Sequence, residues 1–270
     1  MIINHNLNAM NAQRQMSINI GSAGKDIEKL SSGLRINRAG DDAAGLSISE
    51  KMRAQIRGLN QASRNSQDAI SLIQTAEGAL NETHNILQRM RELAVQGAND
   101  TNVTADRSAI KSEIDQLNSE ITRISQKTQF NEQNLLTGSF ASKNFQIGQN
   151  KGISITLSIG DMSATALGVN AVAVDTHANA ADAISTINSA IKTVSQERSK
   201  LGANQNRLEH TISNLDNASE NLQAAESRVR DTDMAKQMMS FTKNNVLTQA
   251  AQAMLAQANQ APQNVLQLLR

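Results

Sequence analysis

Two long stretches, one in each half of the chain, carry apolar residues at heptad spacing. Steps of three and four residues continue for about six heptads in each stretch, which places these positions on one narrow face of a helix. The first seam consists of Ile48, Met52, Gln55, Leu59, Ala62, Ser66, Ala69, Ile73, Ala76, Leu80, Thr83, Leu87, Met90 and Ala94. The second seam consists of Ile184, Ile187, Ile191, Val194, Arg198, Leu201, Gln205, Leu208, Ile212, Leu215, Ser219, Leu222, Glu226 and Val229. Because a narrow seam needs a helical partner, the two stretches are predicted to pair.

The composition favours long helices over a thick globular core. Aromatic residues make up 1% of the 270 residues, so the large side chains that usually fill a core are nearly absent. Pro262 is the single proline, and the rest of the chain lacks the residue that most often breaks a helix. We therefore predict a mainly α fold: a long helical rod, a coiled coil or bundle of antiparallel helices formed by the N- and C-terminal halves, with a small β hairpin.

The helices are expected in five places. Residues 1–32 have a modest amphipathic pattern, and the first long helix is predicted over 43–98. A shorter helix follows, for which Thr104 is the candidate N-cap. The second long helix is predicted over 180–229, and a last amphipathic segment follows it.

The hairpin is expected in the middle of the chain. Residues 152–160 alternate apolar and hydroxyl side chains, which predicts a β-strand. Residues 145–147 supply a second strand, and the glycine-flanked segment between them suits a turn. Residues 131–138 are interpreted as a break, and 165–180 as the least regular segment.

Charge and composition argue against several classes of partner. The 26 Lys and Arg residues are interleaved with 25 Asp and Glu residues, and no basic patch with aromatic side chains suggests a nucleic-acid interface. No apolar run approaches the roughly 20 residues that cross a bilayer. No cysteine is available for disulfides or thiol chemistry, and no cleavable signal peptide is expected at the start.

No catalytic, metal-binding or cofactor-binding motif is found. The four histidines, none at metal-ligand spacing from another ligand, are His5, His84, His177 and His210. His84 and His210 are interpreted as residues of solvated helix faces. Asp41 and Asp42 precede a helix, so an N-cap is a better interpretation than an acid–base or metal site. The polar residues of the second seam, interpreted as setting helix register rather than binding a ligand, are Arg198, Gln205 and Glu226. We predict that the protein is not an enzyme and needs no cofactor.

A series of long motifs resembles the bacterial flagellin family. They are LSSGLRIN (30–37), DDAAGL (41–46), IRGLNQASRN (56–65), TAEGALNE (75–82), LQRMRELAVQ (87–96), TQFN (128–131) and LAQANQAPQNVLQLLR (255–270). The resemblance covers all of the chain except about residues 140–180. It implies an extracellular structural subunit that polymerises into the flagellar filament for motility. It also implies three parts: paired terminal helices with a connector (1–42 and 230–270), a helical rod (43–229) with a hairpin near 140–160, and no variable outer domains.

The resemblance also implies partners and assembly residues. The subunit would bind copies of itself, and it would leave the cell unfolded by flagellar type III export with a chaperone on its C-terminal helix. A filament cap and hook-associated proteins would be further partners. The candidate polymerisation residues on the terminal helices are Ile3, Leu7, Ile27, Leu30, Met254, Leu255, Val265, Leu266, Leu268 and Leu269.

Flagellins sensed by the flagellin-specific Toll-like receptor use a Leu-Gln-Arg on the first long helix and a Glu on the second. The matching residues here are Leu87, Gln88, Arg89 and Glu113. Leu87 belongs to the first seam, so core packing is the alternative interpretation for it, and Gln88 and Arg89 are the better contact candidates.

Three alternatives to a filament subunit fit the sequence less well. A hook–filament junction protein shares the terminal helices but usually matches these motifs poorly. A secreted enzyme carried on the same terminal segments would need a catalytic insert, for which residues 140–180 are too short. A membrane-surface amphipathic protein would need cations on one helix face and Trp or Phe on the other, which the terminal segments lack.

Overall fold

The computed structural model describes residues 6–268, with side chains through residue 260. The chain divides into two compact units. We call them the terminal unit (Met1–Ala54 with Asn221–Arg270) and the central unit (Gln55–Glu220). Among the described residues, no helix has the length and apolarity needed to span a membrane. The mainly α fold with a small hairpin is confirmed.

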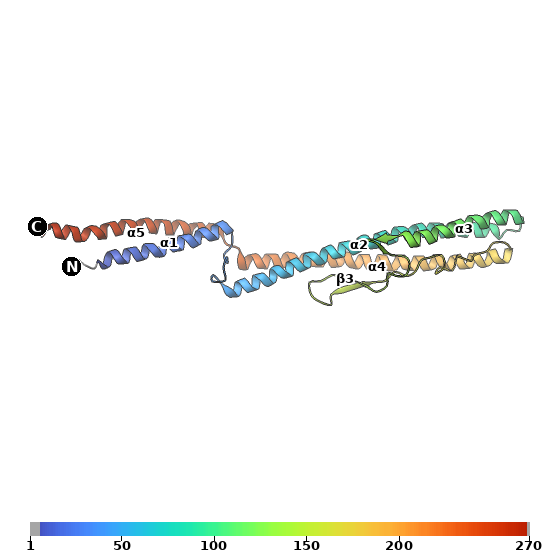
Figure 1. The fold of residues 1–270 in the computed structure, drawn as a ribbon, viewed down its shortest axis with the longest axis horizontal. Coiled ribbons are helices and arrows are strands. Elements are labelled where there is room, and N and C mark those ends of the chain that lie inside the picture. The colour runs from blue at the N-terminus through green and yellow to red at the C-terminus, as the bar shows by residue number, and fades with distance from the viewer. Residues whose placement is uncertain (1–5, 269–270) are drawn as a thin grey trace. The chain divides into compact units, whose positions relative to one another are not determined.

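The terminal unit contains two antiparallel helices, α1 (Leu7–Ser32) and α5 (Met234–Leu268), which lie side by side (Figure 1). At one end, the Asn6 side chain donates a hydrogen bond to the Ala258 carbonyl at 2.7 Å. At the other end, Leu34 and Asp231 form an antiparallel β-bridge. Between these ends, the Asp26 carboxylate accepts hydrogen bonds from the amides of Gln237 and Asn244, at 2.6 and 2.7 Å. These polar contacts set the register of the two helices.

The connector after α1 is held mainly by backbone hydrogen bonds. The Arg35 N–H donates to the Arg230 carbonyl at 2.7 Å, and the Ile36 side chain is completely buried. Asp42 caps the next helix as predicted, because its Oδ1 accepts the Gly45 N–H at 2.8 Å. Asp41 does not act as a cap: its carboxylate accepts the backbone N–H groups of the preceding loop, and these bonds lower its pKa.

A methyl group added at Gly45 should loosen this connector. An added Cβ would lie 2.5 Å from the Asp42 Oδ2 and 2.7 Å from the Ile36 Cδ1. We expect Gly45→Ala to lower the free energy of unfolding of the terminal unit by about 1–3 kcal/mol, as overpacking does. Gly78→Ala is the matched control on the same helix, because a Cβ there meets nothing within 4 Å. Its better helix propensity should raise stability by up to about 1 kcal/mol. Thermal unfolding monitored by circular dichroism tests both variants. Equal melting temperatures for the two variants would contradict the packing argument.

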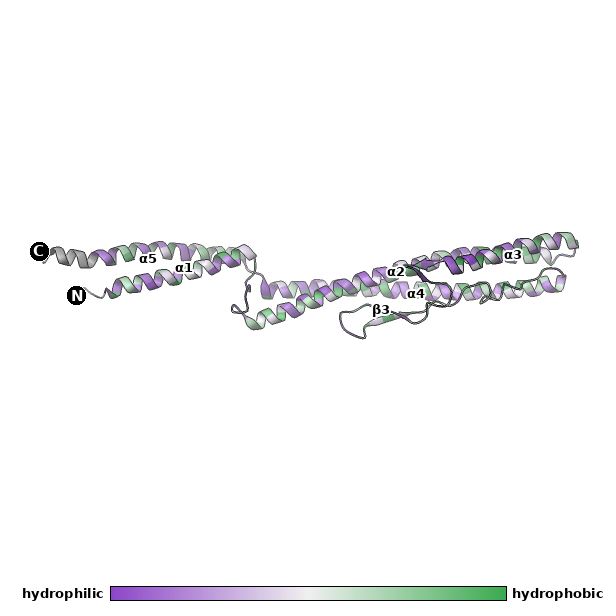
Figure 2. Ribbon diagram, viewed as in Figure 1, coloured by the Kyte–Doolittle hydropathy of each residue, from purple (hydrophilic) through white to green (hydrophobic). Residues whose placement is uncertain are grey.

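The central unit is built on α2 (Ala43–Gly97), α3 (Thr104–Lys127) and α4 (His177–Arg230). Figure 2 shows apolar and polar residues alternating along α2 and α4, as the heptad pattern predicts. The first seam is confirmed from Leu59 to Ala94, where all of its residues are buried, but its first part was wrong, since Ile48 and Gln55 are exposed. Thr104 is the first residue of α3 rather than its cap. The bond at this helix start runs from the Val103 N–H to the Asp106 carboxylate, at 3.2 Å.

The prediction of the second seam was wrong at every other position, where the buried residue is the one before the predicted residue. Ile187, Val194, Leu201, Leu208 and Leu215 are buried as predicted, but Ile184, Ile191 and Arg198 are only half-buried. Their places in the core are taken by the preceding residues, which are Ala183, Ala190 and Glu197. The loop segment after the hairpin also covers this side of α4: the Glu197 Oε1 accepts the Gly160 N–H at 3.2 Å. Because this segment covers α4 in addition to its helical partner, the buried face of α4 departs from the line of heptad positions.

Two small hairpins lie between α3 and α4. The predicted one pairs β3 (Lys143–Gln146) with β4 (Ser154–Leu157), with Lys143 opposite Leu157. The other pairs β1 (Gln129–Phe130) with β2 (Gln133–Asn134), where the sequence suggested only a break. Residues 158–176 form no long element, but Val169 and Val174 are fully buried. This segment therefore belongs to the core shared by α2, α3 and α4.

Candidate interaction surfaces

Helices α1 and α5 expose an unusual amount of apolar surface. Ala23 is the one buried residue in α1, at 8% exposure. The exposed large apolar residues of the terminal helix pair are Leu7, Met10, Ile18, Ile20, Ile27, Met234, Met238, Met239, Val246, Leu247 and Met254. A large exposed apolar area usually marks a contact with another protein or a membrane.

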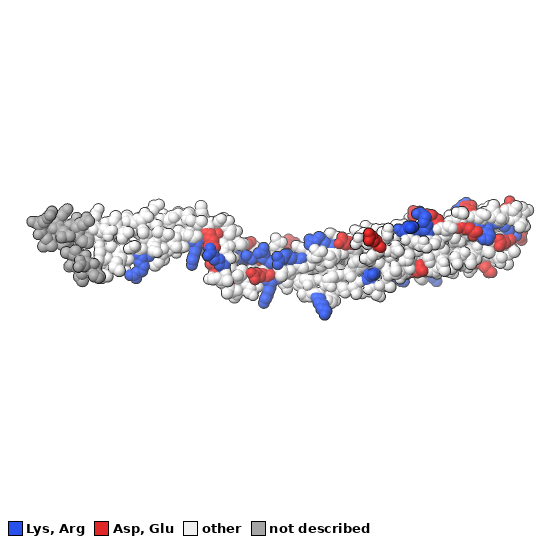
Figure 3. Space-filling model, in the orientation of Figure 1, with Lys and Arg blue, Asp and Glu red and all other residues white. Residues whose placement is uncertain are grey.

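The same helices are nearly free of charge. In α5 the charged residues are Lys236 and Lys243, and residues 244–268 contain none. In α1 the charges are Arg14 and a cluster between residues 25 and 29. Figure 3 shows this surface as mostly uncharged, whereas the visible face of the central unit carries many charges of both signs. A helix pair with little charge and exposed apolar residues is suited to burial against like surfaces.

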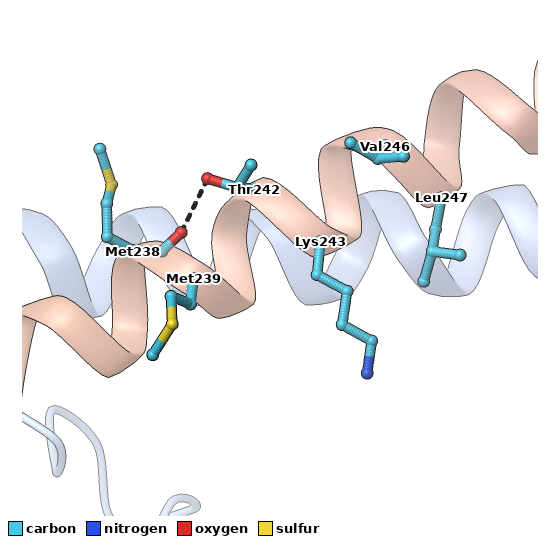
Figure 4. A pocket seen from close by; sticks show the side chains of 6 residues that line it. All are labelled: Met238, Met239, Thr242, Lys243, Val246 and Leu247. Atoms are coloured by element: carbon cyan, nitrogen blue, oxygen red, sulfur yellow. Dashed lines mark hydrogen bonds between the residues drawn. The ribbon is translucent and has the colours of Figure 1, made fainter.

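One apolar hollow lies on α5 alone, lined by methionine and aliphatic side chains (Figure 4). Met238, Met239, Val246 and Leu247 form its walls, and Lys243 and Thr242 complete it. The Thr242 hydroxyl donates to the Met238 carbonyl at 2.9 Å, so its hydrogen-bonding capacity as a donor is used within the helix. Flexible methionines adapt to partner surfaces, which suits a packing site between subunits.

The structure describes five of the ten predicted polymerisation side chains. Leu7, Ile27 and Met254 are exposed, and Leu30 and Leu255 are half-buried. Ile3 and Leu269 lie outside the described residues. Val265, Leu266 and Leu268 fall in α5, but beyond the side chains that the structure describes. Eight further exposed apolar residues of this helix pair are not among the predicted ones: Met10, Ile18, Ile20, Met234, Met238, Met239, Val246 and Leu247.

The four predicted receptor residues split into a buried one and an exposed group. Leu87 is completely buried and packs in the core, so it does not contribute a free surface. Gln88, Arg89 and Glu113 are exposed. The Arg89 guanidinium bonds the Glu113 Oε1 through two nitrogens, at 3.0 and 3.1 Å, and lies 3.2 Å from Glu92. The two carboxylates, Glu113 foremost, raise the pKa of Arg89.

The part of the chain that the structure describes contains no cluster of three or more His, Cys, Asp or Glu side chains able to hold a metal. His210 is exposed as predicted, but His84 is half-buried, and its Nδ1 lacks a hydrogen-bond partner among the described residues. Its Nε2 lies 2.8 Å from the Gln88 amide nitrogen. In the second seam, Arg198 pairs with Glu77 at 3.6 Å rather than facing a ligand site.

Comparison with known proteins adds an independent line of evidence. The model of the bacterial flagellin N-terminal helical region matches residues 3–141, and that of the C-terminal helical region matches 184–269. The chain is 65% identical over 272 residues to a flagellin of Halalkalibacterium halodurans, with full coverage of both chains. It is 53% identical over 286 residues to the flagellar filament 33 kDa core protein of Treponema phagedenis, again with full coverage. A crystal structure of Bacillus cereus flagellin aligns with a TM-score of 0.52 and 34% identity, covering 56% of this chain and 88% of that one.

Proposed function

The chain belongs to the bacterial flagellin family, and from this premise we propose that its subunits polymerise into the helical flagellar filament through helices α1 and α5. As a flagellin, it is a structural protein of the extracellular filament. The observation that supports α1 and α5 as the assembly surface is their exposed apolar face, which carries almost no charge. A large apolar side chain gains roughly 1.5–3 kcal/mol when it is buried, so the eleven exposed apolar residues can supply a strong contact.

We propose that the connector separates two parts of the subunit with different roles in the filament. Residues 1–42 and 230–270 form the inner filament core, and 43–229 form the helical domain that carries the hairpin. The boundaries between the two compact units lie elsewhere, after residue 54 inside α2 and before residue 221 inside α4. The segment between the hairpin and α4 is short, which supports the absence of variable outer domains.

Salt-induced polymerisation of the purified protein tests this function. The measurement is negative-stain imaging of the sample together with the pelleted fraction after centrifugation. Long filaments of uniform diameter are expected. Soluble subunits or amorphous aggregates under all salt conditions would contradict the proposal.

The apolar helices also bear on export and assembly. A free subunit exposes Met238, Met239 and Val246 to water, so a chaperone that covers the C-terminal helix would prevent premature association. We propose export of the unfolded chain through the flagellar type III apparatus, followed by assembly under a cap protein and contact with hook-associated proteins at the filament base.

Recognition by a host Toll-like receptor is the second proposed function. It is supported by the exposed group in which Gln88 adjoins Arg89 on α2 and Glu113 approaches from α3. An exposed arginine held by a carboxylate is a common anchor of protein interfaces.

Replacing Arg89 should therefore affect recognition much more than folding. We expect Arg89→Ala monomers to need about 30-fold more protein for half-maximal receptor activation. The melting temperature should stay within about 2 °C, because the head group is exposed. Activation of receptor-expressing cells is measured beside a melting curve, with Arg123→Ala on α3 as the control. An unchanged response to Arg89→Ala would show that this arginine is only a solvated helix residue.

A further inference from the structure

Methionine is the principal target for a mild oxidant in this chain. The sequence contains ten methionines, and it has no cysteine, tryptophan or tyrosine to compete for the oxidant. A peroxide converts the methionine thioether into a sulfoxide, and the susceptibility of each sulfur follows its exposure. The exposure of the methionines therefore decides where such an oxidant acts on the folded protein.

The exposed methionines of the described residues all lie on α1 and α5. They are Met10, Met234, Met238, Met239 and Met254, with exposures between 49% and 67%. In the central unit, Met90 and Met162 are buried, at 0% and 4% exposure. Met16 and Met52 of the terminal unit are half-buried. An oxidant should therefore modify the terminal helices and leave the core of the central unit unchanged.

Two of these five side chains form walls of the apolar hollow on α5, which they leave in different directions (Figure 4). They are Met238 and Met239. The side chains that line the hollow include two hydrogen-bond donors, the Thr242 hydroxyl and the Lys243 ammonium. The Thr242 hydroxyl already donates within the helix, so a sulfoxide oxygen has only the Lys243 ammonium to pair with among these side chains. A polar oxygen left unpaired is hydrated in a free subunit, but it costs free energy when the surface is buried.

The chemical change is a transfer of one oxygen atom. The O–O bond of hydrogen peroxide breaks, one oxygen forms a bond with the thioether sulfur, and the other leaves as water. The sulfur loses two electrons and the peroxide gains them. The side chain changes from apolar to polar, and methionine sulfoxide reductases reverse the change. In the reverse step two thiols become a disulfide, and the sulfoxide oxygen leaves as water.

We propose that the five exposed methionines of α1 and α5 are the oxidation sites of this protein, and that their sulfoxides block the assembly of free subunits. The proposal rests on the proposed function, because a sulfoxide opposes assembly only where the terminal helices become buried. Neighbouring subunits cover the same sulfurs in the filament. A subunit is therefore sensitive to a peroxide before it joins the polymer and protected afterwards.

Peptide mapping by mass spectrometry tests where the oxidant acts. Wild-type subunits and preformed wild-type filaments are treated with graded doses of hydrogen peroxide. In subunits, we expect sulfoxide to form at the five exposed methionines more than about tenfold faster than at Met90 and Met162, which are internal controls in the same sample. In filaments, the five should react as slowly as the two buried methionines. Equal rates at exposed and buried methionines in subunits would overturn the proposal, as would equal rates at the five in subunits and filaments.

The critical concentration for salt-induced polymerisation tests the effect on assembly. Oxidised wild-type subunits, after removal of the peroxide, should need at least about tenfold more protein than untreated subunits, because one unpaired polar group in the contact has a cost of that order. Treatment with methionine sulfoxide reductases A and B and dithiothreitol should restore the untreated value.

Two leucine variants show which methionines are responsible. The first combines Met10→Leu, Met234→Leu, Met238→Leu, Met239→Leu and Met254→Leu, and the second combines Met90→Leu and Met162→Leu as the matched control. Each variant is compared with its own untreated sample, and leucine conserves the side-chain volume. Peroxide should leave the critical concentration of the first variant unchanged and raise that of the control as it does for the wild type. The opposite result would overturn the proposal.

The outcomes separate this inference from the function on which it rests. Failure of the untreated wild-type chain to polymerise would overturn the function and the inference together. Normal polymerisation of wild-type subunits oxidised at all five sites would overturn the inference and leave the filament function intact. If the first leucine variant does not assemble even without peroxide, the reductase treatment decides. Reduction of the sulfoxides that does not restore wild-type assembly would show that the peroxide acts elsewhere, and would overturn the inference.

Discussion

Deletion of residues 261–270 should abolish filament formation and leave the central unit folded. The deleted segment contains Val265, Leu266, Leu268 and Leu269, which follow Pro262 as a dense apolar group. Each of these side chains is worth roughly 1.5–3 kcal/mol when buried, so their loss removes a large part of a contact between subunits. None of the deleted residues belongs to the central unit, so its melting temperature should not change.

The pelleted fraction after salt-induced polymerisation, with negative-stain imaging, measures this effect. Gln263→Ala with Asn264→Ala is the matched control, because it alters the same segment without removing an aliphatic side chain. The control should assemble as the wild type does. Filaments of normal length from the truncated chain would show that the C-terminal apolar group is dispensable.

Leu87→Ala should cause the largest loss of stability among the substitutions considered. Leu87 is completely buried in the core that α2 shares with α3 and α4. Truncation of a buried leucine usually costs about 2–5 kcal/mol, which for a unit of this size lowers the melting temperature by about 5–15 °C. Two residues along, Arg89→Ala should change it little. Thermal melts of both variants decide the matter. A Leu87→Ala variant that melts like the wild type would mean that this part of the seam is not the core.

Periodicity was sufficient to predict the architecture where one helix face meets one partner. The first seam is buried from Leu59 to Ala94. The alternation that predicted the strand is confirmed from Ile155, since Ile155, Leu157 and Ile159 are buried, whereas Ile153 is exposed. In both places the buried residues are evenly spaced, so the spacing in the sequence matches the spacing of burial.

The sequence pattern failed where tertiary contacts compete with it. The buried line on α4 passes through Ala183, Ala190 and Glu197, which an apolar pattern overlooks because two are small and one is charged. The β1–β2 hairpin has two-residue strands and positive φ at a non-glycine turn residue, so it has no clear propensity signal.

The sequence predicts the type of surface that the terminal helices present, but not which residues form that surface. Lack of charge in the terminal segments can be read from the sequence, yet which apolar residues remain exposed depends on how α1 packs on α5. The grouping of Phe130, Phe140 and Phe145 around one hollow was not predictable, because the folding of two hairpins brings the three rings together. Sequence spacing gives no indication that Leu72 of α2 lies beside them.

Protease protection of the terminal helices tests the central claim most directly. In free subunits α1 and α5 bury little of their surface, so they should open readily and be trimmed to roughly residues 40 and 230. In filaments the same helices should be protected, because neighbouring subunits cover them. Limited proteolysis of one preparation, split into monomers and filaments and read by mass spectrometry, makes the comparison. Protection confined to the filaments is the predicted result. Equal cleavage of the terminal helices in both states would contradict their role as the assembly surface.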